Sequence, residues 1–324
     1  MQEILKNVYL VKVPLPGSPL REVNSYIFVG DGKNLLIDVG FNTDESEKAL
    51  RDAFLQLDLK WAETDIFLTH LHADHTGCIQ RLKDNCGKIY IGEYDGMDVN
   101  TMMMDDYWEK DMAIQKHMGL PKGEELHYTD HPAYRGGVTQ PVDFTMAVDG
   151  EEISVGEYRF QIIDLSGHTP GGKGLYERAK KILFCGDHII QKITPNITAW
   201  DRKKDYLGLF MENLKKVAKM DIQRVYSGHR AIITDHRTRV DELLAHHKRR
   251  LDRILELLAE GKKTIYQVAL GVQWDFAGGY YGDFPPEQKW FAGDEVFAHL
   301  EHLKAIGKVE YHEDEKGTWW FHLI

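Results

Sequence analysis

The hydrophobic and polar positions of the N-terminal part of the chain predict short strands interrupted by a helix. Apolar runs at 8–11, 25–29 and 35–39 predict three successive strands, with a Gly-Asp-Gly turn between the last two. The segment 43–57 begins with Thr-Asp-Glu and keeps its apolar residues on one helical face, which predicts an amphipathic helix. A continuous apolar strand at 66–68 then leads directly into a loop.

The same patterns recur further along the chain. Strand character returns at 88–92, 158–163, 181–184 and 224–226, and apolar residues at helical spacing predict a helix over 206–217. Two β-rich halves that each carry helices predict an α/β chain built as an αββα sandwich, with the helices outside the two sheets.

Residues 98–140 break this alternation. The segment is rich in methionine and aromatic residues, and it shows some helical spacing but no strand alternation. We predict a helical insertion. It either forms part of a pocket, as lining or as a lid, or it serves in simple packing or in a dimer contact.

The pattern changes again near residue 237. Apolar residues then trace one helix face as far as Leu258, and Thr264 opens a second helix with capping-box spacing. An aromatic, glycine-rich loop over 276–284 precedes the remaining predicted elements, a helix at 294–306 and strands at 308–311 and 318–321. This order of three helices and a hairpin is typical of a winged helix. His247 falls on the apolar face of the first helix, which favours a core position.

Composition narrows the functional classes. The 324 residues carry 40 Lys and Arg against 51 Asp and Glu, a net charge of −11 that disfavours binding to a phosphate backbone. From residue 246 onward there are 10 basic and 13 acidic residues, so the winged-helix-like segment is acidic as well, and the charge disfavours nucleic acid as a partner. We expect neither a membrane span nor a signal peptide, and three cysteines fit a reducing, cytoplasmic setting.

The sixteen histidines are unevenly spread, and three of them stand with an aspartate in the string Thr-His-Leu-His-Ala-Asp-His-Thr-Gly at 69–77. Neutral imidazole and carboxylate are ordinary zinc ligands. Alternation at the end of a strand sends His70 and His72 the same way, while the following turn can direct Asp74 and His75 elsewhere. The string therefore predicts two adjacent metal ions.

Three later segments offer further ligands in similar settings. His168, Asp187 and His229 each come just after a predicted strand, and each has a glycine before it. Glycine lets the backbone turn sharply and brings a side chain close to a metal. Cys185, two residues before Asp187, is interpreted as a small buried apolar residue.

These residues make the chain resemble metallo-β-lactamase-fold hydrolases, which share the His-x-His-x-Asp-His string, the order of the three later ligands and an early Leu-Ile-Asp-Val-Gly turn at 36–40. The resemblance extends to the C-terminus in lactamase-beta-2-type proteins; glyoxalase II and acyl-homoserine-lactone lactonases share the metal site but usually end differently. It implies a metallo-β-lactamase-fold catalytic domain at 1–236 and a linker helix with a winged-helix-like domain at 237–324. It also implies the two ligand sets, one of His70, His72 and His168 and one of Asp74, His75 and His229, with Asp187 bridging.

The chain departs from the family pattern in two places. Many relatives read Gly-His-Thr-Pro-Gly-His, whereas Gly172 occupies the sixth position here, so any role of that histidine is absent. The stretch of sequence between His75 and His168 is also longer than in the family pattern, and the additional residues correspond to the insertion at 98–140. Substrate identity is therefore expected to depend on the insertion.

The predicted function is a dinuclear metal-dependent hydrolase of a small ester, thioester or lactone, with a bridging hydroxide as nucleophile. The two divalent ions are expected to be Zn²⁺, with Fe or Mn as alternatives. Asp74 and Asp187 are the candidate catalytic residues, Asp74 as a proton acceptor. Asp38 and Thr69 are candidate supports of the ligands, although Asp38 also suits a purely structural turn. The alternative function is a phosphodiesterase or endoribonuclease, and a homodimer is a further hypothesis.

Overall fold

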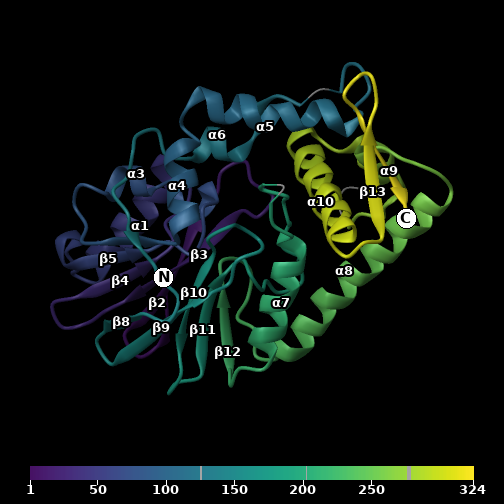
Figure 1. Ribbon diagram of the computed structural model, residues 1–324. Coiled ribbons are helices and arrows are strands. Elements are labelled where there is room, and N and C mark those ends of the chain that lie inside the picture. The colour runs from purple at the N-terminus through teal and green to yellow at the C-terminus, as the bar shows by residue number, and fades with distance from the viewer. Residues whose placement is uncertain (125, 202, 276–278) are drawn as a thin grey trace.

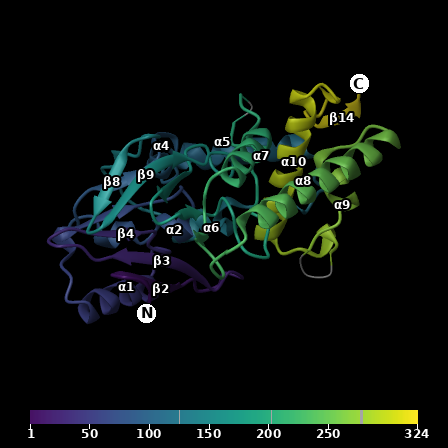
Figure 2. The same cartoon turned by 90° about the horizontal axis from the view of Figure 1, so that it is seen from below.

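Two β-sheets pack face to face, and helices cover their outer faces (Figures 1 and 2). The computed structural model describes residues 1–124, 126–201, 203–275 and 279–324. Aromatic side chains fill the space between the sheets, where Phe28 lies edge-on to Phe160 and Phe184 at centroid distances of 5.1 and 5.2 Å. Buried rings of this size remove much apolar surface from water, so this interface is a large part of the core.

The first sheet has seven strands in sequence order. They are β1 (Gln2–Leu5), β2 (Val8–Pro14), β3 (Glu22–Phe28), β4 (Asn34–Ile37), β5 (Thr64–Phe67), β6 (Ile89–Ile91) and β7 (Thr145–Met146). The pairs from β1 to β4 are antiparallel and those from β4 to β7 are parallel. Its outer face is covered by α1 (Asp44–Gln56), which Thr43 caps as predicted, and by the short helices α2 (Ala73–Thr76) and α3 (Ile79–Leu82).

The second sheet has five strands in the order β12-β11-β10-β9-β8. Their bounds are β8 (Glu152–Val155), β9 (Tyr158–Asp164), β10 (Lys173–Glu177), β11 (Ile182–Gly186) and β12 (Arg224–Ser227). Only β11 and β12 run parallel. The helix α7 (Tyr206–Ala218) covers the outer face, with Phe210 and Leu214 fully buried. The predicted αββα layering is confirmed.

The strand prediction missed four elements: β1, β7, β8 and β10. The segment of β10 follows Gly171 and Gly172 and contains Gly174, so its sequence favours a loop over a strand. Its neighbours β9 and β11 supply the backbone hydrogen bonds that make it a strand. Pairing between distant segments therefore overrides the weak local preference.

The insertion is helical, as predicted. Its helices are α4 (Glu93–Thr101), which begins just before it, α5 (Asp105–Met118) and α6 (Pro132–Gly136), with a 3₁₀ turn η2 (Tyr128–Asp130). Trp108 is buried and donates its indole N–H to Met102 O at 2.6 Å, so this part of the segment packs on itself. The end of α5 contacts the C-terminal elements, because His117 stacks on Trp319 at 4.0 Å. The role of the insertion as a lid stays a prediction.

The C-terminal module consists of α8 (His236–Ala259), α9 (Ile265–Gly271), α10 (Pro286–Ala305), β13 (Val309–Glu313) and β14 (Trp319–Leu323), with a 3₁₀ turn η3 (Tyr281–Asp283). Thr264 forms the predicted capping box with Gln267. The helix α10 begins earlier than expected, because Pro286 suits a first helical position. The order of elements is the expected one, while the winged-helix assignment and the boundary at 236 stay predictions. Of the predicted loop at 276–284, residues 276–278 lie outside the described residues.

The C-terminal module shares its core with the second sheet. Apolar residues of α8, α9 and α10 belong to the same buried cluster as Phe210 of α7 and Val225 of β12. In Figure 2 these helices stand beside the sandwich at the end where α7 lies. Within the described residues, no helix has the length and apolarity needed to cross a membrane.

Candidate metal centre

The seven predicted site residues come together where several strands end. His70 and His72 follow β5, and Asp74 and His75 lie on α2 directly after them. The other three follow strands of the second sheet: His168 follows β9, Asp187 follows β11 and His229 follows β12. Because these strand ends meet between the two sheets, residues far apart in the sequence share a single site. The structure brings all seven together.

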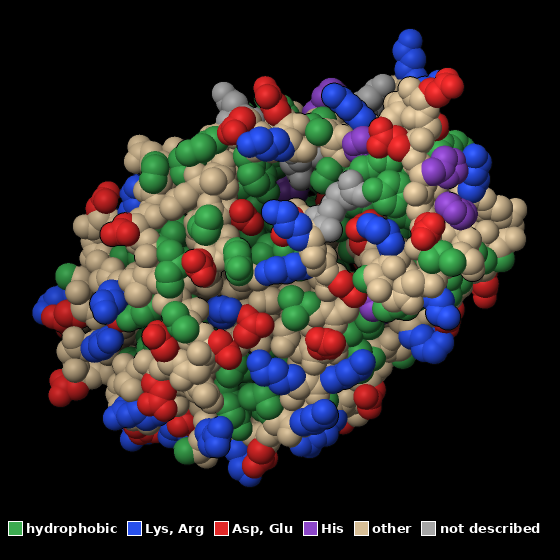
Figure 3. Space-filling model, in the orientation of Figure 1, with side chains coloured by type: hydrophobic (Ala, Val, Ile, Leu, Met, Phe, Trp, Pro, Cys, Tyr) green, Lys and Arg blue, Asp and Glu red, His purple; other side chains and the backbone are tan. Residues whose placement is uncertain are grey.

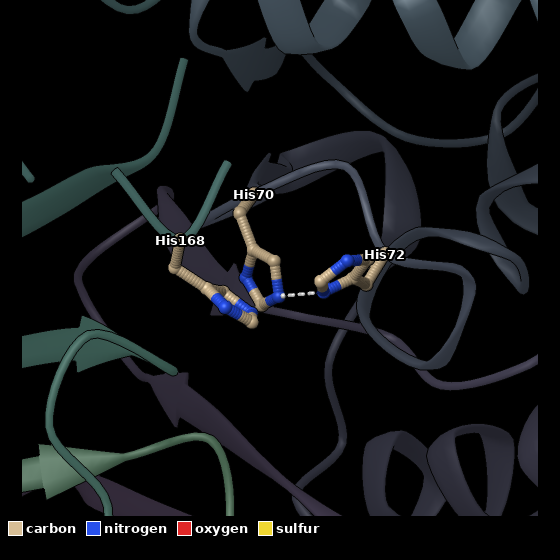
Figure 4. Close-up of side chains that lie close together, drawn as sticks. All are labelled: His70, His72 and His168. Atoms are coloured by element: carbon tan, nitrogen blue, oxygen red, sulfur yellow. Dashed lines mark hydrogen bonds between the residues drawn. The ribbon is translucent and has the colours of Figure 1, made fainter. Parts of the chain in front are cut away.

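One group of three consists of imidazoles only. A ring nitrogen from each of His70, His72 and His168 lies within 4.8 Å of the others, and these rings converge in Figure 4. His70 Nε2 lies 3.0 Å from His72 Nδ1. Two nitrogens that each bind a tetrahedral zinc at about 2.0–2.1 Å are held roughly this close. This group matches the first ligand set that the family resemblance implies.

The other group carries a carboxylate. Asp74 Oδ2 lies 3.2 Å from His229 Nε2 and 3.9 Å from His75 Nε2. Asp187 stands beside both histidines, with Oδ1 at 3.5 Å from His75 Nε2 and Oδ2 at 3.4 Å from His229 Nε2. Asp187 also forms a triad of ligand atoms with His70 and His75. It therefore lies between the two groups, where a bridging ligand would be.

The donor atoms fit a bound cation. Four of them are buried and have no hydrogen-bond partner: Nε2 of His75, His168 and His229, and Oδ1 of Asp187. Burying polar atoms in this state is costly unless something else satisfies them. Among the described residues, neither Asp74 nor Asp187 pairs with a lysine or arginine. Divalent metal ions would satisfy all of these atoms at once.

Each of these three imidazoles uses its other ring nitrogen to contact an oxygen. His75 Nδ1 lies 2.8 Å from Asp38 Oδ2, His168 Nδ1 lies 2.5 Å from Asn196 O, and His229 Nδ1 lies 2.8 Å from Glu22 O. A hydrogen bond from Nδ1 to oxygen leaves the Nε2 lone pair free for a metal and fixes the ring orientation.

Asp38 supports two parts of the site. Of the two interpretations that the sequence left open, a support of the ligands or a purely structural turn, the contacts favour the first. Its Oδ1 accepts from the Thr69 backbone N–H at 2.8 Å, and its Oδ2 accepts from the Thr69 hydroxyl at 2.8 Å and faces His75. Thr69 Oγ1 also lies 3.0 Å from His70 Nδ1. Asp38 has a left-handed backbone with φ of 57°, which an aspartate tolerates better than most residues. Asp38 and Thr69 together orient a ligand from each group.

Glycine allows the close approach predicted near the ligands. A Cβ added to Gly228 would lie 2.4 Å from Asp187 Oδ1 and 2.4 Å from the His75 ring. Gly186 has φ of +51°, and its Cβ would lie 2.4 Å from Thr69 Oγ1. Any other residue at these two positions would displace a ligand or its support.

Burial and neighbouring charge set the protonation of the site. Burial, together with the surrounding histidines, lowers the pKa of His70 well below its usual range and that of His72 to about 3. Both imidazoles are therefore neutral, which is the form that binds metal. Burial alone would raise the pKa of Asp74, but His75 and His229 outweigh it and hold that pKa at about 2. Asp74 is therefore an ionised carboxylate.

The sequence analysis missed Asp95 on α4. Its carboxylate accepts from the Leu71 backbone N–H at 2.9 Å, the Thr169 hydroxyl at 2.7 Å and the Gly171 backbone N–H at 2.5 Å. It thus joins the loop of His70 and His72 to the loop of His168. Burial raises the pKa of this carboxyl to about 7, although the three donors oppose the shift. A single aspartate in a helix gives no sequence signal for this role.

Trp200 is another residue that the sequence did not indicate. Its ring lies 5.9 Å from that of His72, and its indole N–H donates to His168 O at 3.0 Å. The side chain is only half-buried, so it offers an apolar face next to the candidate ligands. Figure 3 shows a hollow on the surface of the molecule with a histidine in it and hydrophobic side chains nearby. Cys185 is buried, as predicted.

Comparisons with known proteins agree with the geometry. A family model described as the metallo-beta-lactamase superfamily matches residues 19–229. A Caenorhabditis elegans protein named beta-lactamase-like protein 2 homolog is 25% identical over 301 residues, which cover 93% of this chain and 84% of that protein. A metallo-beta-lactamase family protein from Thermus thermophilus has a crystal structure that matches with a TM-score of 0.82 and 26% identity, over 99% of this chain and 100% of that one.

A more distant relative carries a substrate class in its name. The Gallus gallus protein named acyl-coenzyme A thioesterase is 22% identical over 216 residues, which cover 64% of this chain and 73% of that protein.

Proposed function

The chain belongs to the metallo-beta-lactamase superfamily, and from that premise we propose that it is a dinuclear metal-dependent hydrolase of a small ester, thioester or lactone, with a thioester as the first choice. The observation that carries the proposal is the set of four buried donor atoms without partners, contributed by His75, His168, His229 and Asp187. Other buried histidines, such as His188, also have ring nitrogens without a hydrogen-bond partner. Here, however, the unpartnered atoms converge with two carboxylates that no lysine or arginine of the described residues neutralises, so bound cations explain the set best.

We assign one ion to His70, His72 and His168 and the other to Asp74, His75 and His229, with Asp187 shared. Imidazole with carboxylate suits Zn²⁺, which is the proposed metal, while Fe and Mn accept the same donors. When bound, a pair of such ions lowers the pKa of water toward roughly 7 and polarises a carbonyl or phosphoryl oxygen.

The remaining chemistry belongs to the side chains. Asp74 is the proposed proton acceptor, because its carboxylate is ionised and its side chain is 14% exposed at the edge of the site. It would take a proton from the attacking water and pass it to the leaving group. Asp38 holds His75, and Thr69 holds His70, so that neither ring turns during the reaction. Trp200 provides an apolar surface for the substrate beside His72.

One observation supports a small-molecule substrate and another supports a thioester. The net charge of −11 disfavours a long polyanion such as RNA as substrate. The relative from Gallus gallus is named for hydrolysis of acyl-coenzyme A, which is a thioester. A small-molecule substrate is therefore proposed over a nucleic acid. A homodimer and a cytoplasmic location stay predictions.

The test uses the full chain purified without chelator. Elemental analysis is expected to give two equivalents of a transition metal per chain. The loaded protein is then assayed on a short acyl-coenzyme A, an S-acyl glutathione, a homoserine lactone, an activated phosphodiester and single-stranded RNA. We expect thioester turnover that disappears in metal-free protein and returns when Zn²⁺ is added.

Two variants complete this test. His72→Ala is expected to lose the turnover, whereas His312→Ala, which removes an exposed histidine of β13, is expected to keep it. Less than one equivalent of metal would contradict the dinuclear centre. RNA cleavage lost in His72→Ala, with no thioester turnover, would replace the proposed function by the phosphodiesterase alternative.

A further inference from the structure

The segment between β11 and α7 forms neither helix nor strand over its described residues, 187–201 and 203–205. A segment of this kind lacks the regular backbone hydrogen bonds that fix the course of a helix or strand. It nevertheless takes part in the metal centre, because the backbone carbonyl of Asn196 faces His168 Nδ1 at 2.5 Å. Whatever fixes the position of Asn196 therefore also fixes the orientation of the His168 ring.

The Asn196 side chain contacts the C-terminal module. Its Nδ2 donates to Phe291 O at 2.8 Å and to Glu295 Oε2 at 3.2 Å, and both acceptors lie on α10. Its Oδ1 accepts from the Thr198 hydroxyl at 3.2 Å. Because both ends of the amide have partners, the side chain has one preferred orientation.

The module also holds the same segment on both sides of Asn196. On one side, Arg239 of α8 donates to Ile190 O and Ile193 O, each at 2.8 Å. On the other side, His302 of α10 lies 2.7 Å from Asp205 at the start of α7. The course of the segment thus depends on contacts with α8 and α10.

Glu295, which accepts from Asn196, is itself held in place. Its other carboxylate oxygen pairs with Arg250 of α8, and these side chains are only 10% and 7% exposed. The Arg250 guanidinium lies 4.4 Å from the centre of the Trp274 ring and donates to Gln273 O at 3.3 Å. A buried ion pair with these further contacts leaves Glu295 little freedom to move.

The other two supported histidines take their oxygen partners from the first sheet. Asp38 follows β4 directly, and Glu22 is the first residue of β3. The partner of His168, by contrast, lies in the middle of a long segment without regular structure between β11 and α7. We propose that Asn196 is a positioning residue for His168 and that the C-terminal module, through Glu295, is a structural part of the metal centre.

This inference rests on the metal centre of the proposed function but not on its substrate. Its test is therefore metal binding. Metal-free wild-type protein and Asn196→Ala are titrated with Zn²⁺ against a competing chelator. We expect one of the two ions to bind about 10–100-fold more weakly in Asn196→Ala, the usual effect of removing an indirect support of a ligand, and the other to bind as in the wild type.

The matched control is Asn100→Ala. Asn100 also holds a loop by its amide, since its Nδ2 and Oδ1 both bond to the backbone of Val142 at 2.9 Å, but it contacts none of the candidate ligands. Both ions are expected to bind Asn100→Ala as they bind the wild type. Circular dichroism and thermal unfolding of the metal-free proteins show whether either variant has lost its fold.

A second variant tests the role of the module. Glu295→Gln keeps an oxygen that can accept from Asn196 but loses the charge that holds Arg250, so the same ion is expected to bind several-fold more weakly. The double variant Asn196→Ala with Glu295→Gln should bind that ion no more weakly than Asn196→Ala alone, because both changes act through one contact. Loading with Co²⁺ gives a second readout. In each variant, the absorption spectrum of one of the two bound ions is expected to differ from that in the wild type.

Wild-type affinity for both ions in Asn196→Ala would overturn the proposal. So would equal weakening of both ions, or fully additive effects in the double variant, since either would indicate a general loss of structure. Failure of the proposed function shows up separately, as absence of thioester turnover by wild-type protein that binds two ions.

Discussion

Two regions of the molecule gather histidines, and they differ in how their carboxylates are used. The candidate metal centre contains five histidines with Asp74 and Asp187, and its groups have ligand atoms within 4.8 Å of one another. His246, His247 and Glu295 of the C-terminal module meet the same distance criterion. We name this second set the C-terminal histidine cluster. By distance alone the two regions look alike.

Charge separates them. In the part of the chain that the structure describes, Asp74 and Asp187 have only histidines as charged neighbours within ion-pair distance. Glu295 is paired with Arg250 and also accepts from Asn196. A carboxylate already neutralised by a buried guanidinium is a poor ligand, and the nearby positive charge repels a metal ion. Carboxylates without a cationic side-chain partner, more than nearby histidines, therefore distinguish the candidate metal centre.

The largest expected effect comes from replacing one buried histidine in each region by leucine. His75 and His247 are both 0% exposed. His75→Leu should lose at least one ion and more than about 100-fold of the turnover, because even an indirect support of a ligand is worth about 10–100-fold. His247→Leu should keep both ions and its turnover. Elemental analysis and steady-state kinetics check both variants. Loss of metal from His247→Leu would contradict the distinction between the candidate metal centre and the C-terminal histidine cluster.

Much of the candidate metal centre could be predicted, because its residues lie in short, recognisable sequence patterns. His70 to His75 stand in one short string, and His168, Asp187 and His229 each follow a recognisable strand. The packing of the two sheets was likewise predictable from alternation and helical spacing. The core position of His247 on its apolar helix face is also confirmed.

The supports of the centre were not predictable in the same way. Asp95 bonds to Thr169 across 74 positions, and Asn196 bonds to Glu295 across 99. Neither residue belongs to a motif, and each acts through a backbone group or a loop that only the folded chain brings near. Strand β10 was missed for a related reason, since its pairing with β9 and β11 outweighs its glycine-rich local sequence.

A smaller effect is expected when a support of the centre is weakened. Asp38→Asn removes the negative charge beside His75 Nδ1 but keeps an oxygen of similar size. We expect metal affinity to fall by about 10–100-fold with little change in fold. The control is Asp65→Asn, because Asp65 is also a buried carboxylate of the first sheet but pairs with Lys33 and bonds to the Lys88 backbone. Equal loss of affinity in both variants would show that charge beside the ligand is not what matters.

The smallest expected effect concerns acid stability and His299, a neighbour of the C-terminal histidine cluster. His247 Nδ1 lies 3.2 Å from His299 Nε2, and both side chains are fully buried. Burial, aided by nearby Arg250, lowers the pKa of His299 to about 3, while an unfolded histidine titrates near 6.5. Below about pH 6.5, His299 is therefore protonated in the unfolded state but stays neutral in the folded state. The free energy of unfolding falls as the pH drops through this range.

For His299 the loss should reach about 2 kcal/mol at pH 5, which is 1.5 pH units below the unfolded pKa at about 1.4 kcal/mol per unit. Urea unfolding of metal-free wild-type protein and of His299→Phe, at pH 7 and pH 5, measures it. The metal-site residues titrate in both proteins and so cancel in the comparison. The wild type should lose about 2 kcal/mol more than the variant between the two pH values. An equal loss would mean that His299 accepts a proton in the folded protein despite its burial and the nearby positive charge of Arg250.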